Sequence, residues 1–307
     1  MKNMDVVGLG ALNYDKLYVV TKIAKAGEEV GVKEVRESPG GSAANTIFGL
    51  ARVGAKTGFI GAVGNDEEGG VILRDLANED VDINRIKVLD GNSGIAIGLV
   101  DDDGERSLYI YPGVNDEFDV SDVDVEYIEG AKFLHMSSFV DRRQLEMQVS
   151  LIERIKTRVS FNPGMLCSKF SLETLQPIIE KSDVIFVNYE EMETLTNSDY
   201  ERGSKLLIEM GAKTVATTLG KGGCYVTNGK NAHLVPSCKT KVVDTTGAGD
   251  AFAAGFLYGV LGGEDTHNCG RMGNFFAARC ISEYGARKGL PHKRDLEAAF
   301  PKPVALQ

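Results

Sequence analysis

The chain has 307 residues and is 43% hydrophobic, so it holds enough apolar material for a large core and is not a disordered, collagen-like or small disulfide-stapled protein. Its formal net charge of -10 opposes the anionic field of nucleic acid and of anionic membranes, which predicts a small-molecule partner and binding to neither. Glycine supplies 36 residues, about 12% of the chain against a usual level of about 7%.

Cysteine usage and the first residues bear on the compartment. The five cysteines form no C-x-x-C pair and are odd in number, which disfavours both a zinc site and a disulfide framework. The chain begins with a mixed-charge segment that leads directly into the strand-like VVGLG, and no run of 18 apolar residues occurs. We therefore expect a cytoplasmic protein without a membrane anchor.

Short apolar runs alternate with amphipathic segments along most of the chain. The runs, which are typical of strands buried on both faces, are Met4–Gly10, Gly58–Gly64, Lys132–Ser137, Val159–Asn162, Asp183–Asn188, Thr214–Leu219 and Cys224–Thr227. The candidate helices are Ala43–Val53, Glu67–Ala77, Arg142–Lys156, Leu172–Lys181, Arg202–Met210, Ala248–Leu261, Asp265–Glu283 and Arg294–Phe300. This alternation predicts an α/β fold, with a doubly wound, mostly parallel sheet sandwiched by helices in a single domain over residues 1–307.

Two stretches depart from this rhythm. Tyr14–Arg36 and Ser93–Tyr111 show period-two, β-branched character, and the second contains a turn at Asp101–Gly104. We expect two antiparallel hairpins, over about residues 14–37 and 93–112, that pair into a small inserted β-sheet and close over a site as a lid. The exposed edges of such a sheet predict a homodimer formed through the lid.

The first glycine cluster begins like a dinucleotide-binding motif. The string GLGALN at residues 8–13 matches G-x-G-x-x-G except that Asn13 replaces the third glycine. The following residues alternate as a strand and open no helix that could receive a pyrophosphate, so a nicotinamide oxidoreductase is disfavoured. Asn13 and Asp15 remain at a strand end, either as ordinary turn residues or as binders of hydroxyl groups.

The second cluster is the string PGGSAAN at residues 39–45, which leads into an Ala-rich helix. Gly40 and Gly41 permit close approach of the backbone to a ligand, and small residues at the start of a helix leave N–H donors accessible. Asn45, one turn into the helix, would face the same space. Alone, this pattern is also typical of an ordinary loop.

The third cluster is the string DTTGAGD at residues 244–250, at the start of another helix. The backbone amides of Gly247, Ala248 and Gly249, together with the helix dipole, predict an anion hole. Asp250 then has two interpretations: a first-turn acid that stabilises the helix dipole, or a general base beside a phosphate site. No G-x-x-x-x-G-K-[ST] motif occurs, which excludes P-loop chemistry.

Taken together and in this order, the second and third clusters strongly resemble the two signatures of the ribokinase-like (PfkB) family of sugar and nucleoside kinases. The resemblance covers essentially the whole chain. It implies that Asp250 is the catalytic base and that Gly247–Gly249 form the anion hole. It also implies a set of residues that bind the hydroxyls of the acceptor: Asn13, Asp15, Gly40, Gly41 and Asn45.

The same resemblance implies nucleotide and metal sites. Asn188 and Glu191 match the family motif N-x-x-E, in which Glu191 would help to position Mg²⁺ through water and Asn188 would lie near the phosphates. The string TLGKGG at residues 218–223 is similar to a loop along the nucleotide, and a position on a late helix is similar to one near the adenine edge; these assignments are Thr218, Gly220, Gly223 and Asn274. Asp244 and Thr246 resemble a site for a monovalent cation such as K⁺, with backbone carbonyls as the main ligands.

The resemblance thus implies a Mg²⁺-dependent kinase that transfers the terminal phosphoryl group of ATP to a hydroxyl of a ribose-type sugar. A nucleoside acceptor is the alternative, and Tyr109 and Tyr111 on a lid strand could stack on its base or simply pack the lid. A non-catalytic sugar-binding protein is a further alternative, although it would gain nothing from an intact Asp250. The acceptor motifs contain no Arg/Lys pair, which favours a neutral polyol over a phosphorylated sugar. The segment HMSS at residues 135–138 lacks the acid that some sugar kinases of the family carry there, which disfavours a ribokinase-type acceptor pocket.

Overall fold

A computed structural model describes residues 3–102 and 106–301 of the chain. The strands of its larger sheet, sheet A, follow the order β13-β12-β11-β10-β9-β8-β1-β4-β5 within the described residues. From β5 to β11 all neighbours pair in parallel, whereas β12 and β13 are antiparallel additions at one edge. The strands are β1 (Met4–Leu9), β4 (Thr57–Gly64), β5 (Asp82–Leu89), β8 (Ala131–Ser137), β9 (Arg158–Asn162), β10 (Ser182–Asn188), β11 (Val215–Thr218), β12 (Cys224–Thr227) and β13 (Ala232–Val235).

Helices cover both faces of sheet A, which explains why most of its strands are apolar runs without alternation. On β1, Val6 packs into one core cluster and the adjacent Val7 into the other, because successive side chains point to opposite faces. One face is covered by α1 (Ser42–Arg52), α2 (Glu67–Asn78), α9 (Ala248–Leu261), α10 (Thr266–Cys280) and α11 (Lys293–Ala299). The other is covered by α3 (Val125–Glu129), α4 (Arg142–Arg154), α5 (Gly164–Ser168), α6 (Leu172–Lys181), α7 (Tyr189–Thr196) and α8 (Tyr200–Glu209). The predicted doubly wound α/β fold is confirmed.

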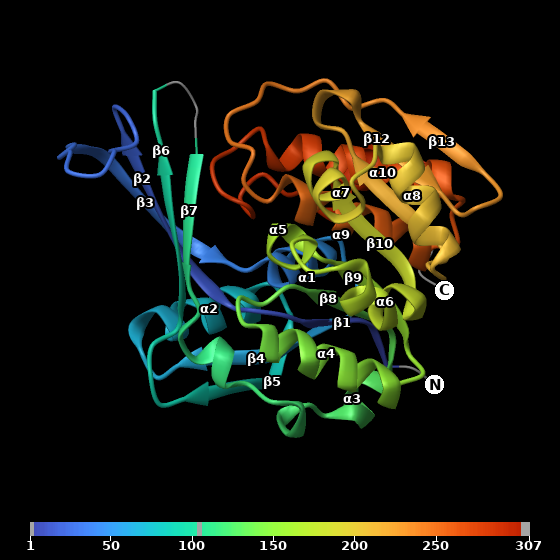
Figure 1. The fold of residues 1–307 in the computed structure, drawn as a ribbon, viewed down its shortest axis with the longest axis horizontal. Helices are drawn as coiled ribbons and strands as arrows, with labels where there is room; N and C mark the ends of the chain where they lie inside the picture. The colour runs from blue at the N-terminus through green and yellow to red at the C-terminus, as the bar shows by residue number, and fades with distance from the viewer. Residues whose placement is uncertain (1–2, 103–105, 302–307) are drawn as a thin grey trace.

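The two inserted hairpins form a second sheet, sheet B, that stands at one side of sheet A (Figure 1). Its order is β3 (Val32–Gly40), β2 (Asn13–Val20), β6 (Gly94–Val100) and β7 (Arg106–Tyr111). Each hairpin is antiparallel and the two join into one sheet, as the sequence predicts. The joining pair is β2 with β6, which are parallel. Of the predicted turn at Asp101–Gly104, the last two residues lie outside the described part of the chain.

Some elements are not evident from the apolar pattern. β5 is an edge strand of sheet A whose sequence, DINRIKVL, carries polar residues at most outward positions and therefore does not read as a buried run. The short helices α3, α5 and α7 and three 3₁₀ turns, at Gly113–Glu117, Val120–Asp122 and Gly220–Gly222, also lack a helical period of useful length. In the residues that the structure describes, no helix is both long and apolar enough to span a membrane.

Candidate active site

A cavity of about 370 Å³ lies between sheet B and the loops that follow the parallel strands of sheet A. Carboxyl ends of parallel strands meet at one edge of a sheet, so loops far apart in the sequence converge there. Ser138 after β8 and Ala11 after β1 both line this cavity. The predicted site residues that the cavity brings together are Asn13, Asp15, Gly41, Asn45, Asp244, Thr246, Gly247 and Asp250.

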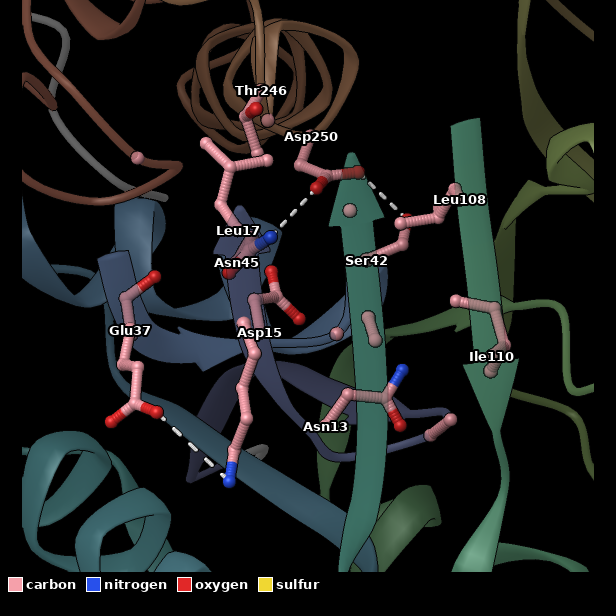
Figure 2. Close-up of a pocket in the computed structure, with 18 of the residues that line it drawn as sticks. Asn13, Asp15, Leu17, Glu37, Ser42, Asn45, Leu108, Ile110, Thr246 and Asp250 are labelled. Atoms are coloured by element: carbon pink, nitrogen blue, oxygen red, sulfur yellow. Dashed lines mark hydrogen bonds and ion pairs between the residues drawn. The ribbon is translucent and has the colours of Figure 1, made fainter. Parts of the chain in front are cut away.

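Asp250 lies in the first turn of α9 and points into this cavity (Figure 2). Its carboxylate accepts hydrogen bonds from Ser42 Oγ at 2.7 Å and from Asn45 Nδ2 at 2.9 Å. Desolvation by the surrounding protein raises the pKa of Asp250 to about 6, against the lowering effect of these two hydrogen bonds and of Arg287. A carboxylate with this pKa is mostly ionised at neutral pH and can still accept a proton.

The start of α9 borders the same space: of the three predicted anion-hole residues Gly247 lines the cavity, whereas Ala248 and Gly249 do not. Gly247 precedes the helix with φ 74°, and among the described residues no side chain caps its first amides. A Cβ at Gly247 would overlap the Cβ of Ala286, so this turn requires glycine. Ala248 N–H donates to Thr245 O at 3.2 Å, which leaves the amides on either side of it as the better anion donors in the predicted trio. Such a helix N-terminus can bind an anion.

Asn13 and Asp15 are positioned by neighbours from other elements. Asn13 Oδ1 accepts a hydrogen bond from Asn115 Nδ2 at 3.2 Å, and Asn115 is buried. The carboxylate of Asp15 packs against Gly40, where a Cβ would overlap it. The structure therefore gives Gly40 the function of making room for Asp15, while Gly41, the N-cap residue of α1, lines the cavity.

The predicted cation residues tie two loops together. Asp244 Oδ1 accepts a hydrogen bond from Thr246 N at 2.9 Å, and Asp244 Oδ2 accepts one from Gly285 N at 2.9 Å. The carbonyl oxygen of Thr246 accepts a bond from Cys280 Sγ at 3.5 Å. Within residues 3–102 and 106–301, no group of three or more His, Cys, Asp or Glu side chains is placed to hold a metal ion. A K⁺ site here would thus depend on backbone carbonyls.

Asn188 and Glu191 form a capping box at the start of α7. Glu191 N donates to Asn188 Oδ1 at 2.8 Å, and Asn188 N donates to Glu191 Oε2 at 2.9 Å. Burial raises the pKa of Glu191, the Asn188 amide lowers it, and the negative charge of Asp250 raises it further. Glu191 therefore lies within the electrostatic field of Asp250, where a cation between the two acids would be favourable.

The remaining nucleotide candidates lie at the far end of the sheet. Thr218 ends β11, and the turn that follows is closed by a hydrogen bond from Leu219 N to Gly223 O at 2.8 Å, with Gly220 at its start. Asn274 is buried, and its Nδ2 donates to Val235 O at 3.1 Å and to Pro236 O at 3.0 Å. The structure thus shows Asn274 supporting the end of β13, while its contact with a nucleotide stays a prediction.

Leucine and isoleucine, not tyrosine, form the lid wall of the cavity. Leu108 and Ile110 of β7 line it, whereas Tyr109 and Tyr111 do not and are 60% and 49% exposed. Side chains alternate between the faces of a strand, so the two tyrosines lie on the opposite face of sheet B. The suggested stacking of these tyrosines on a base in the cavity is therefore wrong.

The sequence reasoning missed several polar residues of this cavity, among them a serine of α1 and three charged residues of sheet B. Ser42, which donates to Asp250, lies inside the PGGSAAN string and could have been found there as a hydroxyl beside the two glycines. Lys16 pairs with Glu68 at 2.9 Å, and Arg36 pairs with Glu34 at 2.6 Å and stacks 3.7 Å from the ring centre of Tyr284. Charged lid residues resemble ordinary surface residues in a sequence, so no local signal distinguishes them; the three are Lys16, Arg36 and Glu37.

A doubly wound sheet, a small second sheet beside its carboxyl edge, and a carboxylate at a glycine-opened helix N-terminus together define a small-molecule phosphotransferase that acts on an alcohol group. The sequence matches the pfkB family of carbohydrate kinases over residues 3–293. The chain belongs to this family.

Individual relatives and structures agree with this family. An uncharacterized sugar kinase of Archaeoglobus fulgidus is 42% identical over 251 residues, which is 81% of this chain and 100% of the relative. An ATP-dependent ribose-1-phosphate kinase of Halopiger xanaduensis is 30% identical over 300 residues, covering 96% of this chain and 97% of the relative. The crystal structure of a ribokinase from Thermotoga maritima superposes with a TM-score of 0.87 at 24% identity, covering 97% of this chain and 100% of that one. The Arabidopsis thaliana ribokinase complexed with ribose and ATP gives a TM-score of 0.85 at 23% identity, covering 96% and 98%.

Proposed function

We propose that the chain is a Mg²⁺-dependent kinase that transfers the terminal phosphoryl group of ATP to a hydroxyl of a ribose-type sugar, with Asp250 as general base. One observation carries the proposal: the Asp250 carboxylate faces the cavity and also lies in the first turn of the glycine-opened helix α9. A hydroxyl bound in the cavity and a phosphoryl group at the helix N-terminus would then be neighbours of the same carboxylate.

Each group would have a separate task in this reaction. Asp250 accepts the proton of the attacking hydroxyl, and the Gly247–Gly249 amides stabilise charge on the transferred phosphoryl group. The other hydroxyls of the sugar bind to the side chains of Asn13, Asp15 and Asn45. Sheet B, acting as a lid, excludes water that would otherwise be phosphorylated in place of the sugar.

The residues present fit the metal and the nucleotide that this reaction needs. Glu191 offers the carboxylate oxygen that Mg²⁺ prefers, directly or through water, and Mg²⁺ would neutralise phosphate charge. A K⁺ ion held partly by the Thr246 carbonyl and the Asp244 loop would strengthen the neighbouring anion hole. The residues proposed to contact the nucleotide are Asn188, Thr218, Gly220, Gly223 and Asn274.

The charge of the cavity favours a neutral acceptor. Its charged lining consists of four acids and two bases, and carboxylates pair with both bases: Lys16 with Glu68 and Arg36 with Glu34. A sugar phosphate would have to displace these partners and lie among the remaining acids. This supports a free sugar over a phosphorylated one, although a relative is named for ribose 1-phosphate.

One observation favours a nucleoside acceptor as the second candidate. Much of the cavity wall is apolar, and apolar side chains of sheet B lie on the same face of that sheet as Asn13 and Asp15. A free sugar leaves such a wall without a partner, whereas a nucleobase would cover it. The apolar side chains are Leu17, Leu108, Ile110, Phe139, Val140 and Leu166.

A coupled kinase screen tests these candidates with ATP and with ADP as donors. Its acceptors are ribose, fructose, ribose 1-phosphate, ribose 5-phosphate, adenosine, cytidine and inosine. We expect turnover with ATP and a neutral acceptor. Turnover with sugar phosphates alone would contradict the neutral-acceptor proposal, and no turnover with any pair would favour a binding protein.

The pH dependence of the reaction should report Asp250. Its raised pKa of about 6 means that the carboxyl is protonated, and thus inactive as a base, below that pH. We expect kcat/KM for the acceptor to fall about tenfold per pH unit below pH 6. Steady-state rates between pH 4.5 and 8.5, with coupling enzymes in excess, measure this limb. If kcat/KM fell only below about pH 4, the group that titrates would be a well-solvated carboxylate, which would count against Asp250 as the base.

The outer face of sheet B supports the proposed homodimer. Val35, Ile97, Tyr109 and Tyr111 are all exposed there, on the side away from the cavity. We expect twice the single-chain mass of 33.1 kDa by light scattering, and a single-chain mass for the double variant Ile97→Asp, Tyr109→Glu. Leu234→Glu, on the edge strand of sheet A, is the control because Leu234, 62% exposed, is about as exposed as Tyr109, at 60%. A wild-type protein that is monomeric at high concentration would refute the dimer.

A further inference from the structure

Arg287 is a buried guanidinium beneath the acceptor cavity, in the loop between α10 and α11. It is only 7% exposed, and the sequence patterns give it no function. Its Nε donates to Asn45 Oδ1 at 2.8 Å, its Nη2 donates to Gly40 O at 3.1 Å, and its Nη1 pairs with Asp75 of α2. The guanidinium carbon also lies 5.0 Å from the ring centre of Phe48. One side chain thus joins α2, the end of β3 and α1.

The contact with Asn45 fixes which way its amide points. The oxygen of Asn45 accepts from Arg287, and its nitrogen donates to Asp250 at 2.9 Å. Arginine can only donate hydrogen bonds, and an ionised carboxylate can only accept them. Only one orientation of the Asn45 amide satisfies both neighbours. Without Arg287 the amide could turn its oxygen toward the Asp250 carboxylate, which would be repulsive.

The contact with Gly40 acts on the other side of the cavity. Gly40 packs against the Asp15 carboxylate, and its carbonyl oxygen is held by Arg287. The same guanidinium therefore supports the backbone under Asp15 and the amide beside Asp250. Asp75, whose side chain is 34% exposed, balances its charge from α2.

We propose that Arg287 is a positioning residue of the phosphoryl transfer: it orients Asn45 toward Asp250 and holds Gly40 in place under Asp15. This inference rests on the proposed function of Asp250 as the base. Its fork of donors is essential, because a lysine at this site would supply the charge at a single point and could not bond Asn45, Gly40 and Asp75 together.

The electrostatics agree with this geometry. Burial lowers the pKa of Arg287, and the negative charges of Asp75, Asp15 and Asp250 act in the opposite direction. In return, Arg287 lowers the pKa of Asp250. The other titratable groups that face Asp250 are Glu191 of α7 and Cys280 of α10, and burial raises the pKa of Cys280 to about 12, so this thiol stays neutral.

The first test compares Arg287→Met and Arg287→Lys with a matched control. Arg52→Met also removes a guanidinium over the ring of Phe48, with its ion pair to Glu79 and its hydrogen bond from Nη1 to the carbonyl oxygen of Arg287 at 2.7 Å. It leaves the Arg287 guanidinium and its bonds to Asn45, Gly40 and Asp75 in place, so it controls for a loosened loop around Arg287. For Arg287→Met we expect a kcat about 10–100-fold below wild type, KM for ATP within about twofold, and an acid limb displaced to higher pH. Arg287→Lys should lose part of kcat with a smaller displacement, and Arg52→Met should alter thermal stability alone.

The second test separates this inference from the proposed function. In the Asp250→Asn background, Arg287→Met should cause no further loss of kcat, because the group that it positions is gone. Carboxyl ¹³C NMR titration, assigned by difference with Asp250→Asn, should show a higher titration midpoint for Asp250 in Arg287→Met, and it needs no turnover. An unmoved midpoint in a folded Arg287 variant, or kcat losses that simply multiply, would overturn the inference. If the titration midpoint of Asp250 moves in Arg287→Met but the Asp250→Asn enzyme is still active, Arg287 does act on Asp250, and Asp250 is not the base.

Discussion

Asp250→Asn should lower kcat by about 10²–10⁴-fold while the affinity for ATP stays close to that of the wild type. Asparagine has the shape of aspartate, so its oxygen can still accept the Asn45 hydrogen bond and its nitrogen can face the Ser42 hydroxyl. It cannot take up the proton of an attacking hydroxyl. The measurements are kcat with the acceptor found in the screen and ATP binding by calorimetry. An unchanged kcat would reject Asp250 as the general base.

Stability distinguishes this interpretation from the simpler one, in which Asp250 only stabilises the dipole of α9. The pKa of Asp250 is raised to about 6 from an ordinary 3.8, so the folded protein holds the proton more tightly than the unfolded chain does. The ionised carboxylate therefore costs stability at neutral pH, and this cost builds up as the pH rises through the interval between these values. Asp250→Asn should raise the free energy of unfolding at pH 7.5 by about 1–3 kcal/mol.

If Asp250 only interacts with the helix dipole, Asp250→Asn should instead lower the free energy of unfolding, by about 0.3–1 kcal/mol. Glu201→Gln is the matched control, because Glu201 is an exposed acid in the first turn of α8. It should show this small loss and no change in kcat. A destabilised Asp250→Asn variant with normal turnover would therefore establish the dipole function alone.

The sequence predicts the parts of the site that are local in the chain. Apolar runs reveal strands such as β4, all of whose residues are buried, and the DTTGAGD string places Gly247 and Asp250 at the start of α9. Both depend on interactions between close neighbours. The prediction of strands from apolar runs misses β5, because the outer face of this strand is charged. β5 is stabilised by its pairing with β4 in sheet A, which is not a local interaction in the chain.

Two other features depend on tertiary pairing and cannot be predicted from local pattern. Which face of β7 meets the cavity follows from its register with β6, where Leu108 lies opposite Gly98 and Ile110 opposite Ala96. These small residues leave room for the cavity, and the register turns the tyrosines outward. Arg287 is still more remote, because it reaches Asn45 across a separation of 242 residues, and a pattern of short range gives it no signal.

Gly247→Ala should lower kcat by about 10²–10³-fold with little change in KM for the acceptor, because it disturbs the amides that stabilise charge in the transition state. The added Cβ meets the Cβ of Ala286, and φ of 74° disfavours any side chain. The turn must therefore move, and the Gly247 and Gly249 N–H groups move with it. We propose that the acceptor binds elsewhere, at Asn13 and Asp15, so its binding should survive.

Gly27→Ala isolates the backbone part of this effect. Gly27 has φ 84° in the loop between β2 and β3, and a Cβ there would have nothing within 4 Å, so the variant pays a similar conformational cost away from the cavity. It should lose up to about 1 kcal/mol of stability and no kcat. If Gly247→Ala behaves like Gly27→Ala, the amides at the start of α9 do not stabilise the transferred phosphoryl group. If kcat falls only in Gly247→Ala while its acid limb stays near pH 6, the amides and the base act as separate parts of one reaction.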